Sequence, residues 1–290
     1  MAFTPGYLEE GNEGMNRQSA SRFQQRFALC RTFARTGTSN RSVIASATYS
    51  TVSVKPAFSP LRTGELAMRK IIVGAQVSLD GVMQAPGGPW EDPTKGFKFG
   101  GWVMPYFDQV FGEEIDRVFK EKCDLLLGRK TYEIFAGYWP YYDETAPAGG
   151  IAKLFKDIKK YVVSRSGDVN TSWQGSVLLR DIADVKRLRE EDGPKLVTQG
   201  STELVHALFA NDLVDAMSIF TVPVVLGGGK KLFADGSVPH RYKLTSSRVS
   251  STGLMIGHYD RAGEIKVGDT ALDSPSDAER ARRERMKREG

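Results

Sequence analysis

Residues 123–133 read Cys-Asp-Leu-Leu-Leu-Gly-Arg-Lys-Thr-Tyr-Glu, and this stretch decides how the rest of the chain is interpreted. The apolar run 123–127, ended by Gly128, predicts a short buried strand, and a helix is expected to begin near Arg129. A helix N-terminus carries partial positive charge, so Arg129 and Lys130 are unfavourable there unless an anion joins them. With the backbone amides and Thr131, the two cations predict a phosphate site. The alternative is a pair of solvated basic residues on a loop.

Strand and helix patterns alternate on both sides of this stretch. Pro223 has no amide to donate, so it weakens the far end of its strand. A turn at 251–253 joins two closing strands into an antiparallel hairpin. The order predicts an α/β fold with a mixed, mostly parallel central sheet, helices on both faces and a C-terminal antiparallel hairpin. Strands are expected at 68–78, 161–163, 196–198, 214–225, 242–250 and 254–259, and helices at 105–122, 148–158, 181–191 and 201–210.

Charge divides the 290 residues into three parts. Residues 1–67 hold eight basic and four acidic side chains and lack apolar periodicity, which predicts a disordered basic leader. The leader is similar to an organelle transit peptide, because residues 15–64 hold no acidic side chain. Two alternatives are a start codon assigned too far upstream, with Met68 as the true start, and a segment left over from protein expression. Residues 68–262 are long enough for one well-filled domain. Residues 263–290 balance seven basic against seven acidic residues and predict a charged flexible tail, as a solvated helix or a frayed segment.

The composition excludes several classes of protein. There is no apolar run of about 18 residues, so no membrane-spanning helix is expected. Cys30 and Cys123 cannot form a disulfide framework, and no Cys/His cluster has the spacing of a metal site. The net charge of +5 comes mostly from the leader, so no nucleic-acid partner is expected for the domain. We expect a cytoplasmic protein, or one of an organelle matrix if the leader is a transit peptide.

Two further strand ends carry polar groups. Gly200 allows close approach of a ligand to the backbone, and Ser201 or Thr202 is expected to cap the following helix. The backbone amides at the start of that helix would then suit a pyrophosphate. Ser164 and Arg165 follow the strand at 161–163, where an arginine can stack on adenine or pair with phosphate. No sequence pattern joins the three histidines into a catalytic triad. The sequence matches neither the Walker nor the Rossmann nucleotide-binding pattern.

The order of these motifs resembles a known fold. Gly128–Glu133, Val162–Arg165 and Gln199–Ser201 resemble the dihydrofolate-reductase-like fold. Ser78-Leu79-Asp80-Gly81 and the run 223–229, Pro-Val-Val-Leu-Gly-Gly-Gly, are similar to the reductase domain of the bifunctional riboflavin-biosynthesis deaminase/reductase and its stand-alone relatives. The resemblance covers about residues 68–260. Because residues 1–67 hold no zinc-site pattern, we expect no deaminase domain in them.

The resemblance implies an NADPH-dependent reductase, often a homodimer, acting on a small heterocycle. The family reaction reduces the ribosyl group of 5-amino-6-(5-phosphoribosylamino)uracil; a dihydrofolate or pteridine reductase and a non-catalytic NADPH-binding protein are the alternatives. Asp80 matches the proposed catalytic acid, with Glu91, Asp92 and Asp108 as further candidates. The aromatic side chains of the loop 84–102 favour a flat heterocycle. The cofactor contacts implied are Gly128, Arg129, Lys130 and Thr131 at the 2′-phosphate, Ser164 and Arg165 at the adenosine, Gly200, Ser201 and Thr202 at the pyrophosphate, and Gly227 and Gly228 at the nicotinamide ribose.

Overall fold

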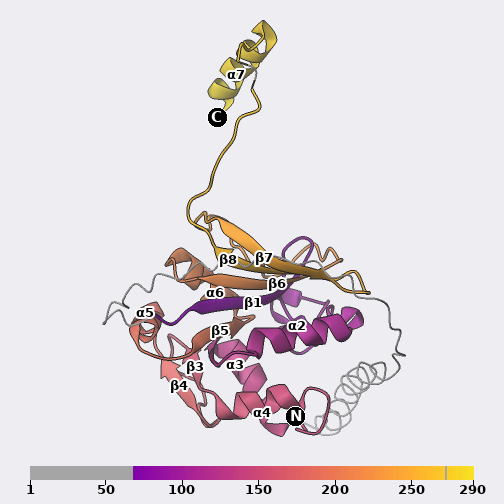
Figure 1. Cartoon of the computed structure of the whole chain (residues 1–290), viewed down its shortest axis with the longest axis vertical. Coiled ribbons are helices and arrows are strands. Elements are labelled where there is room, and N and C mark those ends of the chain that lie inside the picture. Colours follow the sequence, from indigo (N-terminus) through magenta and orange to yellow (C-terminus); the bar gives the residue numbers. More distant parts are fainter. Residues whose placement is uncertain (1–67, 272) are drawn as a thin grey trace, which may run out of the picture.

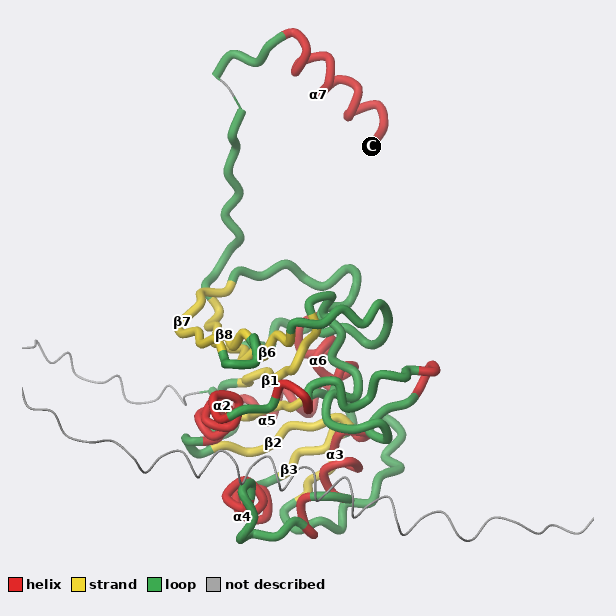
Figure 2. Tube along the Cα trace, turned by 90° about the vertical axis from the view of Figure 1, so that its right-hand side faces the viewer, coloured by secondary structure: helices red, strands yellow, loops and turns green. Residues whose placement is uncertain are grey.

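A computed structural model describes residues 68–271 and 273–290, so the expected leader lies outside the described residues. Within this part of the chain, the centre is an eight-stranded sheet in the order β4-β3-β2-β5-β1-β6-β8-β7. Neighbouring strands from β4 to β6 pair in parallel, and β8 pairs antiparallel with both β6 and β7. Figure 2 shows the strands following one another from β7 and β8 towards β3. The strands are β1 (Ile71–Ser78), β2 (Cys123–Gly128), β3 (Lys160–Val163), β4 (Ser176–Leu179), β5 (Lys195–Gln199), β6 (Ala216–Val222), β7 (Tyr242–Val249) and β8 (Met255–Arg261).

Helices cover both faces of the sheet (Figure 1). On one face, α5 and α6 bury Val185 and Leu208 in a core with Ile71 of β1. On the other, α2 and α4 bury Phe119 and Phe155 against the strand at 123–128. The predicted fold class is therefore confirmed. The helices are α2 (Gln109–Phe119), α3 (Arg129–Ala136), α4 (Gly149–Asp157), α5 (Ile182–Glu190), α6 (Thr202–Ala210) and α7 (Asp277–Glu289), with 3-10 turns η1 (Thr94–Gly96), η2 (Met104–Tyr106) and η3 (Trp139–Tyr141).

Several boundaries differ from the sequence-based expectation, for local reasons. The helix expected from residue 105 begins at Gln109, because the Asp108 carboxylate accepts the amide of Phe111 at 3.0 Å and caps the helix there. The strand expected to reach residue 225 ends at Val222, before Pro223. The pairing of β4 with β3 was not foreseen, since a four-residue edge strand carries too little alternation to be recognised.

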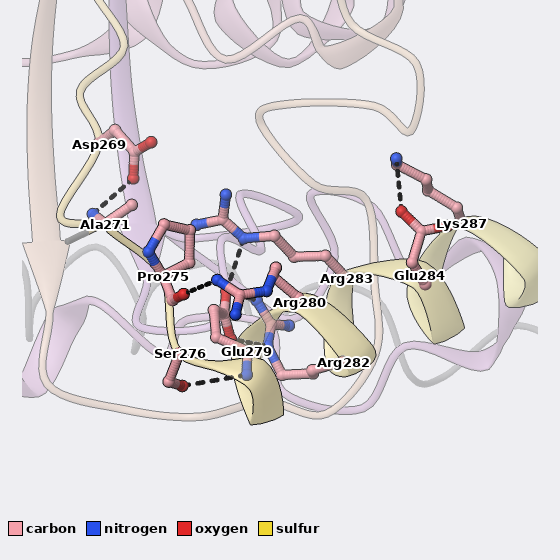
Figure 3. A network of polar contacts seen from close by, with 10 residues as sticks. All are labelled: Asp269, Ala271, Pro275, Ser276, Glu279, Arg280, Arg282, Arg283, Glu284 and Lys287. Carbon is pink, nitrogen blue, oxygen red and sulfur yellow. Dashed lines mark hydrogen bonds and ion pairs between the residues drawn. The ribbon is translucent and has the colours of Figure 1, made fainter. Parts of the chain in front are cut away.

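The C-terminal segment forms α7, which buries no side chain and stands apart from the sheet in Figure 1. Ser276 caps the helix by accepting the amide of Glu279 at 3.2 Å. The Glu279 carboxylate accepts hydrogen bonds from Arg282 and Arg283 at 2.7–2.8 Å (Figure 3). Contacts between side chains three and four residues apart thus support this helix.

None of the helices among the described residues has the length and apolar character that crossing a membrane requires.

Candidate functional site

A cavity of about 1100 Å³ opens at the carboxyl ends of β2, β3 and β5 and continues between the helices α2, α3 and α4. Its volume exceeds the ~300–1000 Å³ typical of a pocket for one drug-sized ligand. The parallel strands deliver their polar loop residues to one end of the cavity, whereas the helices supply apolar side chains. The predicted site residues that line it are Gly128, Arg129, Lys130, Thr131, Ser164, Arg165, Gly200, Ser201 and Thr202.

At the polar end, the starts of α3 and α6 are tied together by two hydrogen bonds. The Gly128 amide donates to Ser201 Oγ at 3.0 Å, and the Ser201 amide donates to Thr131 Oγ1 at 3.1 Å. Gly200 and Ser201 both have left-handed backbone, with φ of 62° and 60°. This conformation is unfavourable for serine, so the two cross-links hold it in place.

The expected capping of α6 is corrected by this geometry. Ser201 lies at the N-cap position of α6, but its Oγ accepts the Gly128 amide instead of an amide of its own helix. The N-cap residue of α3 is Gly128, which has no side chain, so neither helix has a side-chain cap. The first-turn amides of an uncapped helix carry partial positive charge and bind anions. Two such helix starts therefore converge on the polar end of the cavity.

The three cations expected at this end all contribute to the cavity wall. The Arg129 guanidinium reaches Glu133, one turn along α3, at 2.9 Å. Arg165 approaches Glu203 at 3.9 Å, with both side chains largely exposed. Lys130 is also exposed. Exposed ion pairs are weak, so these side chains can exchange their partners for a ligand anion at little cost.

Asp80, Gly227 and Gly228 lie outside the residues that line the cavity. The Asp80 carboxylate accepts hydrogen bonds from Ser78 Oγ at 2.6 Å and from the amides of Leu226 and Gly227 at 3.1 and 2.9 Å. The Ser78 hydroxyl and these amides lower the pKa of Asp80 to about 2. Asp80 is therefore ionised at neutral pH and ties the turn 78–81 to the loop at 226–228.

Two of the further candidates for the catalytic acid, Glu91 and Asp92, do line the cavity. Burial raises the pKa of Glu91, although its carboxylate accepts the amide of Gly87 at 2.8 Å. Asp92 forms an ion pair with Lys230, and hydrogen bonds from Lys230 and Thr94 outweigh its burial and lower its pKa. Of these two carboxyls, Glu91 therefore holds its proton to the higher pH. The remaining candidate, Asp108, is occupied as the cap of α2.

The structure also identifies wall residues that sequence reasoning missed. Gln76 and Gln199 lie along the sheet edge of the cavity, and His206 of α6 lines it while its Nε2 lies 2.9 Å from the Lys231 carbonyl oxygen. Only the positions of Gln76 and Gln199 near strand ends could have indicated them. The aromatic residues expected from the loop 84–102 do not line the cavity: Trp90 is exposed, and Trp102 is buried with its indole N–H donating to the Gln84 carbonyl oxygen at 2.8 Å.

Aromatic side chains from the helices form the apolar end instead. Phe111 of α2 and Phe107, which directly precedes the helix cap Asp108, have ring centres 4.3 Å apart. Phe155 of α4 stacks on Phe135 of α3 at 5.7 Å. The wall is completed by Val103, Met104, Ile115, Phe119, Ile134, Trp139, Ala148 and Ile151.

A second polar network lies away from the cavity and fixes α2 to the sheet. His258 Nε2 lies 2.8 Å from Glu114 Oε2, and its Nδ1 lies 2.9 Å from Ser218 Oγ. Ser218 and Glu114 are buried and do not line the cavity, so this arrangement serves packing. Among residues 68–271 and 273–290, no cluster of three metal-ligating side chains is present.

Several known proteins are similar to this chain in sequence or in structure. The chain is 28% identical to the uncharacterized protein YyaP of Bacillus subtilis (strain 168) over 199 residues, which cover 67% of this chain and 95% of YyaP. It is 28% identical over 200 residues to the uncharacterized protein YwjB of the same organism, covering 67% of this chain and 99% of YwjB. A pyrimidine reductase-like protein from Corynebacterium diphtheriae matches with a TM-score of 0.45 and 14% identity, covering 71% of this chain and 96% of that one. Residues 69–256 match the family described as the RibD C-terminal domain, and the chain belongs to this family.

Proposed function

We propose that this chain is an NADPH-dependent reductase that transfers a hydride to a carbon–nitrogen double bond of a pyrimidine- or pteridine-like heterocycle. Membership of the RibD C-terminal domain family supports a reductase. The observation that carries the choice of cofactor is the convergence of two uncapped helix starts with Arg129, Lys130 and Thr131 on one cavity wall. This combination suits a ligand with several phosphates, and NADPH has three.

The residues at the polar end support an assignment of the phosphates and the adenosine of the cofactor. Arg129, Lys130 and Thr131 would hold the 2′-phosphate, and the start of α6 at 200–202 would hold the pyrophosphate. Ser164 and Arg165, at the end of β3, would flank the adenosine. Gly227 and Gly228 lie off this wall, so we assign them to the loop that Asp80 holds rather than to the cofactor.

Reduction of a carbon–nitrogen double bond also needs a proton at the nitrogen. Bound NADPH would supply the hydride. Glu91 would supply the proton, because it lines the cavity and its burial raises the pKa of its carboxyl, which favours the protonated form. Asp80, the family-based candidate, is the alternative that the experiments below compare with it.

A fluorescence titration of the full chain with NADPH and with NADH tests the cofactor assignment. We expect NADPH to bind more tightly, and Arg129→Ala to weaken NADPH binding roughly tenfold or more without a comparable effect on NADH, because a charge-assisted hydrogen bond contributes ~1.5–3 kcal/mol. Lys153→Ala is the matched control, since Lys153 is exposed on α4 and does not line the cavity. Equal affinities for the two cofactors would refute the assignment. NADPH binding without oxidation over a panel of pteridines and ribosylaminopyrimidines would favour a non-catalytic binding protein.

A further inference from the structure

The apolar end of the cavity indicates what the second ligand is. Twelve of the lining side chains form it, six of them aromatic: Phe107, Phe111, Phe119, Phe135, Trp139 and Phe155. Their ring contacts are close, with Phe119 and Trp139 both about 5 Å from Phe155. Side chains such as Ile115, Ile134 and Ile151 are only half-buried, so apolar surface remains open to a ligand.

The charged side chains of α2 and α4, two of the three helices that form this end, are directed elsewhere, whereas α3 carries its cavity-lining cations Arg129 and Lys130 at its start. On α2, Glu113 and Glu114 pair with Arg248 of β7, and Arg117 lies 3.5 Å from Glu114. On α4, Lys156 pairs with Glu144 at 3.3 Å. No charged residue of α2 or α4, both of which the structure describes in full, lines the cavity.

A phosphate group placed at this end would lose its hydration without gaining a cation, and burying an unpaired charge is strongly unfavourable. The cations that do line the cavity are Arg129, Lys130 and Arg165 at the polar end and Lys230, which is paired with Asp92. We infer that the substrate is a planar, largely apolar heterocycle without a phosphate group, and not a ribosyl-phosphate pyrimidine. This inference rests on the proposed function, in which the polar end is taken by the cofactor.

Three flavins that share one ring system and differ in their side chain make a direct test. Lumiflavin carries a methyl group, riboflavin an uncharged polyol, and flavin mononucleotide the same polyol with a phosphate. Binding is followed by flavin fluorescence with the full chain saturated with NADP⁺. We expect lumiflavin to bind at least as tightly as riboflavin, and flavin mononucleotide roughly tenfold or more weakly than riboflavin. Equal or tighter binding of flavin mononucleotide, or no difference among the three, would overturn the inference.

A pair of variants on α4 localises the binding to the apolar end. Ile151 and Leu154 are both half-buried in the same core cluster, but only Ile151 lines the cavity. Ile151→Ala should weaken lumiflavin binding roughly fivefold, because it removes apolar contact area. Leu154→Ala should leave the affinity unchanged while losing similar stability, which separates a lost contact from impaired folding. Equal effects of the two variants on lumiflavin affinity would contradict the placement.

The outcome also distinguishes failure of this inference from failure of the proposed function. If NADPH binds with the expected preference but flavin mononucleotide binds as well as riboflavin, the reductase proposal stands and the substrate class is wrong. If neither nicotinamide cofactor binds, the flavin series is repeated on the chain without cofactor. The same order of affinities would then support the apolar site independently of any reductase activity.

Discussion

Two carboxyls near the turn and loop that follow β1 have opposite environments. Asp80 accepts one hydroxyl and two amide donors and has a pKa of about 2, whereas burial raises the pKa of Glu91. A group that donates a proton must be protonated at the working pH. The pH dependence of the reaction can therefore show which of the two carboxyls donates the proton. The family resemblance implies Asp80, whereas its low pKa favours Glu91.

If Glu91 donates the proton, the rate of reduction falls as pH rises through its pKa, because only the protonated form is active. Glu91→Gln should lower the rate by about 10²-fold or more and remove this pH dependence. Asp80→Asn should retain it, since Asp80 is already ionised across pH 5–9. The measurement is the single-turnover rate of NADPH oxidation against pH with a substrate found in the panel. Loss of the pH dependence in Asp80→Asn instead would assign the proton to Asp80.

At the scale of elements, the cross-linked starts of α3 and α6 depend on Thr131. Thr131→Val keeps the shape of the side chain but leaves the Ser201 amide without its acceptor. We expect the free energy of unfolding to fall by about 1–2 kcal/mol and Tm by a few degrees. NADPH affinity should fall as well, because residues 200–202 lose a constraint.

Thr145→Val is the control for this change, as Thr145 makes its hydrogen bond to Asp143 on an exposed loop. Its effect on the free energy of unfolding should stay within about 0.5 kcal/mol. Thermal unfolding followed by circular dichroism measures both variants. Equal Tm values for the two would show that the cross-link contributes nothing to stability.

The position of α2, and with it one wall of the cavity, depends on Glu114. Removing this buried carboxylate in Glu114→Ala leaves His258 Nε2 without its partner and leaves Arg248 paired with Glu113 alone. We expect a loss of about 2–3 kcal/mol in the free energy of unfolding, measured by urea denaturation. Glu113→Ala removes the neighbouring, exposed contact to Arg248 and should cost at most about 1 kcal/mol. A larger effect at Glu113 than at Glu114 would contradict this explanation.

At the scale of the whole molecule, β7 lies at the edge of the sheet and β8 is its neighbour. Leu244 and Val249 of β7 and Met255 of β8 are 49%, 69% and 49% exposed, so this side of the sheet presents apolar side chains beside an unpaired strand edge. We expect the hairpin to form the contact of the homodimer that the family resemblance implies. Light scattering after size exclusion should give a dimer for the full chain and a monomer for Val249→Lys/Met255→Lys. A dimer in both would place the contact elsewhere, and a monomer in both would refute the dimer.

The fold followed from the sequence where each residue reports its own environment. Mostly apolar runs such as 123–127 form buried strands, and apolar residues at helical spacing in 105–122 form α2, because both patterns can be read from residues close together in the sequence. Edge strand β4 is not predicted, since it has only four residues, of which Leu179 alone is buried, and its pairing depends on the partner strand β3. Likewise, nine predicted cofactor residues meet on one wall because parallel strands end at the same edge of a sheet.

The sequence by itself therefore determined the order of strands and helices and the polar residues at the strand ends, since both depend on residue type and spacing along the chain. The tertiary structure alone decided which carboxyl lines the cavity, which hydroxyl braces two helices rather than capping one, and which aromatic side chains face a ligand. Those outcomes depend on contacts between residues up to about 150 positions apart, such as Asp80 with Gly227 and Glu114 with His258. No local pattern encodes such contacts, because they exist only after the sheet has brought distant segments together.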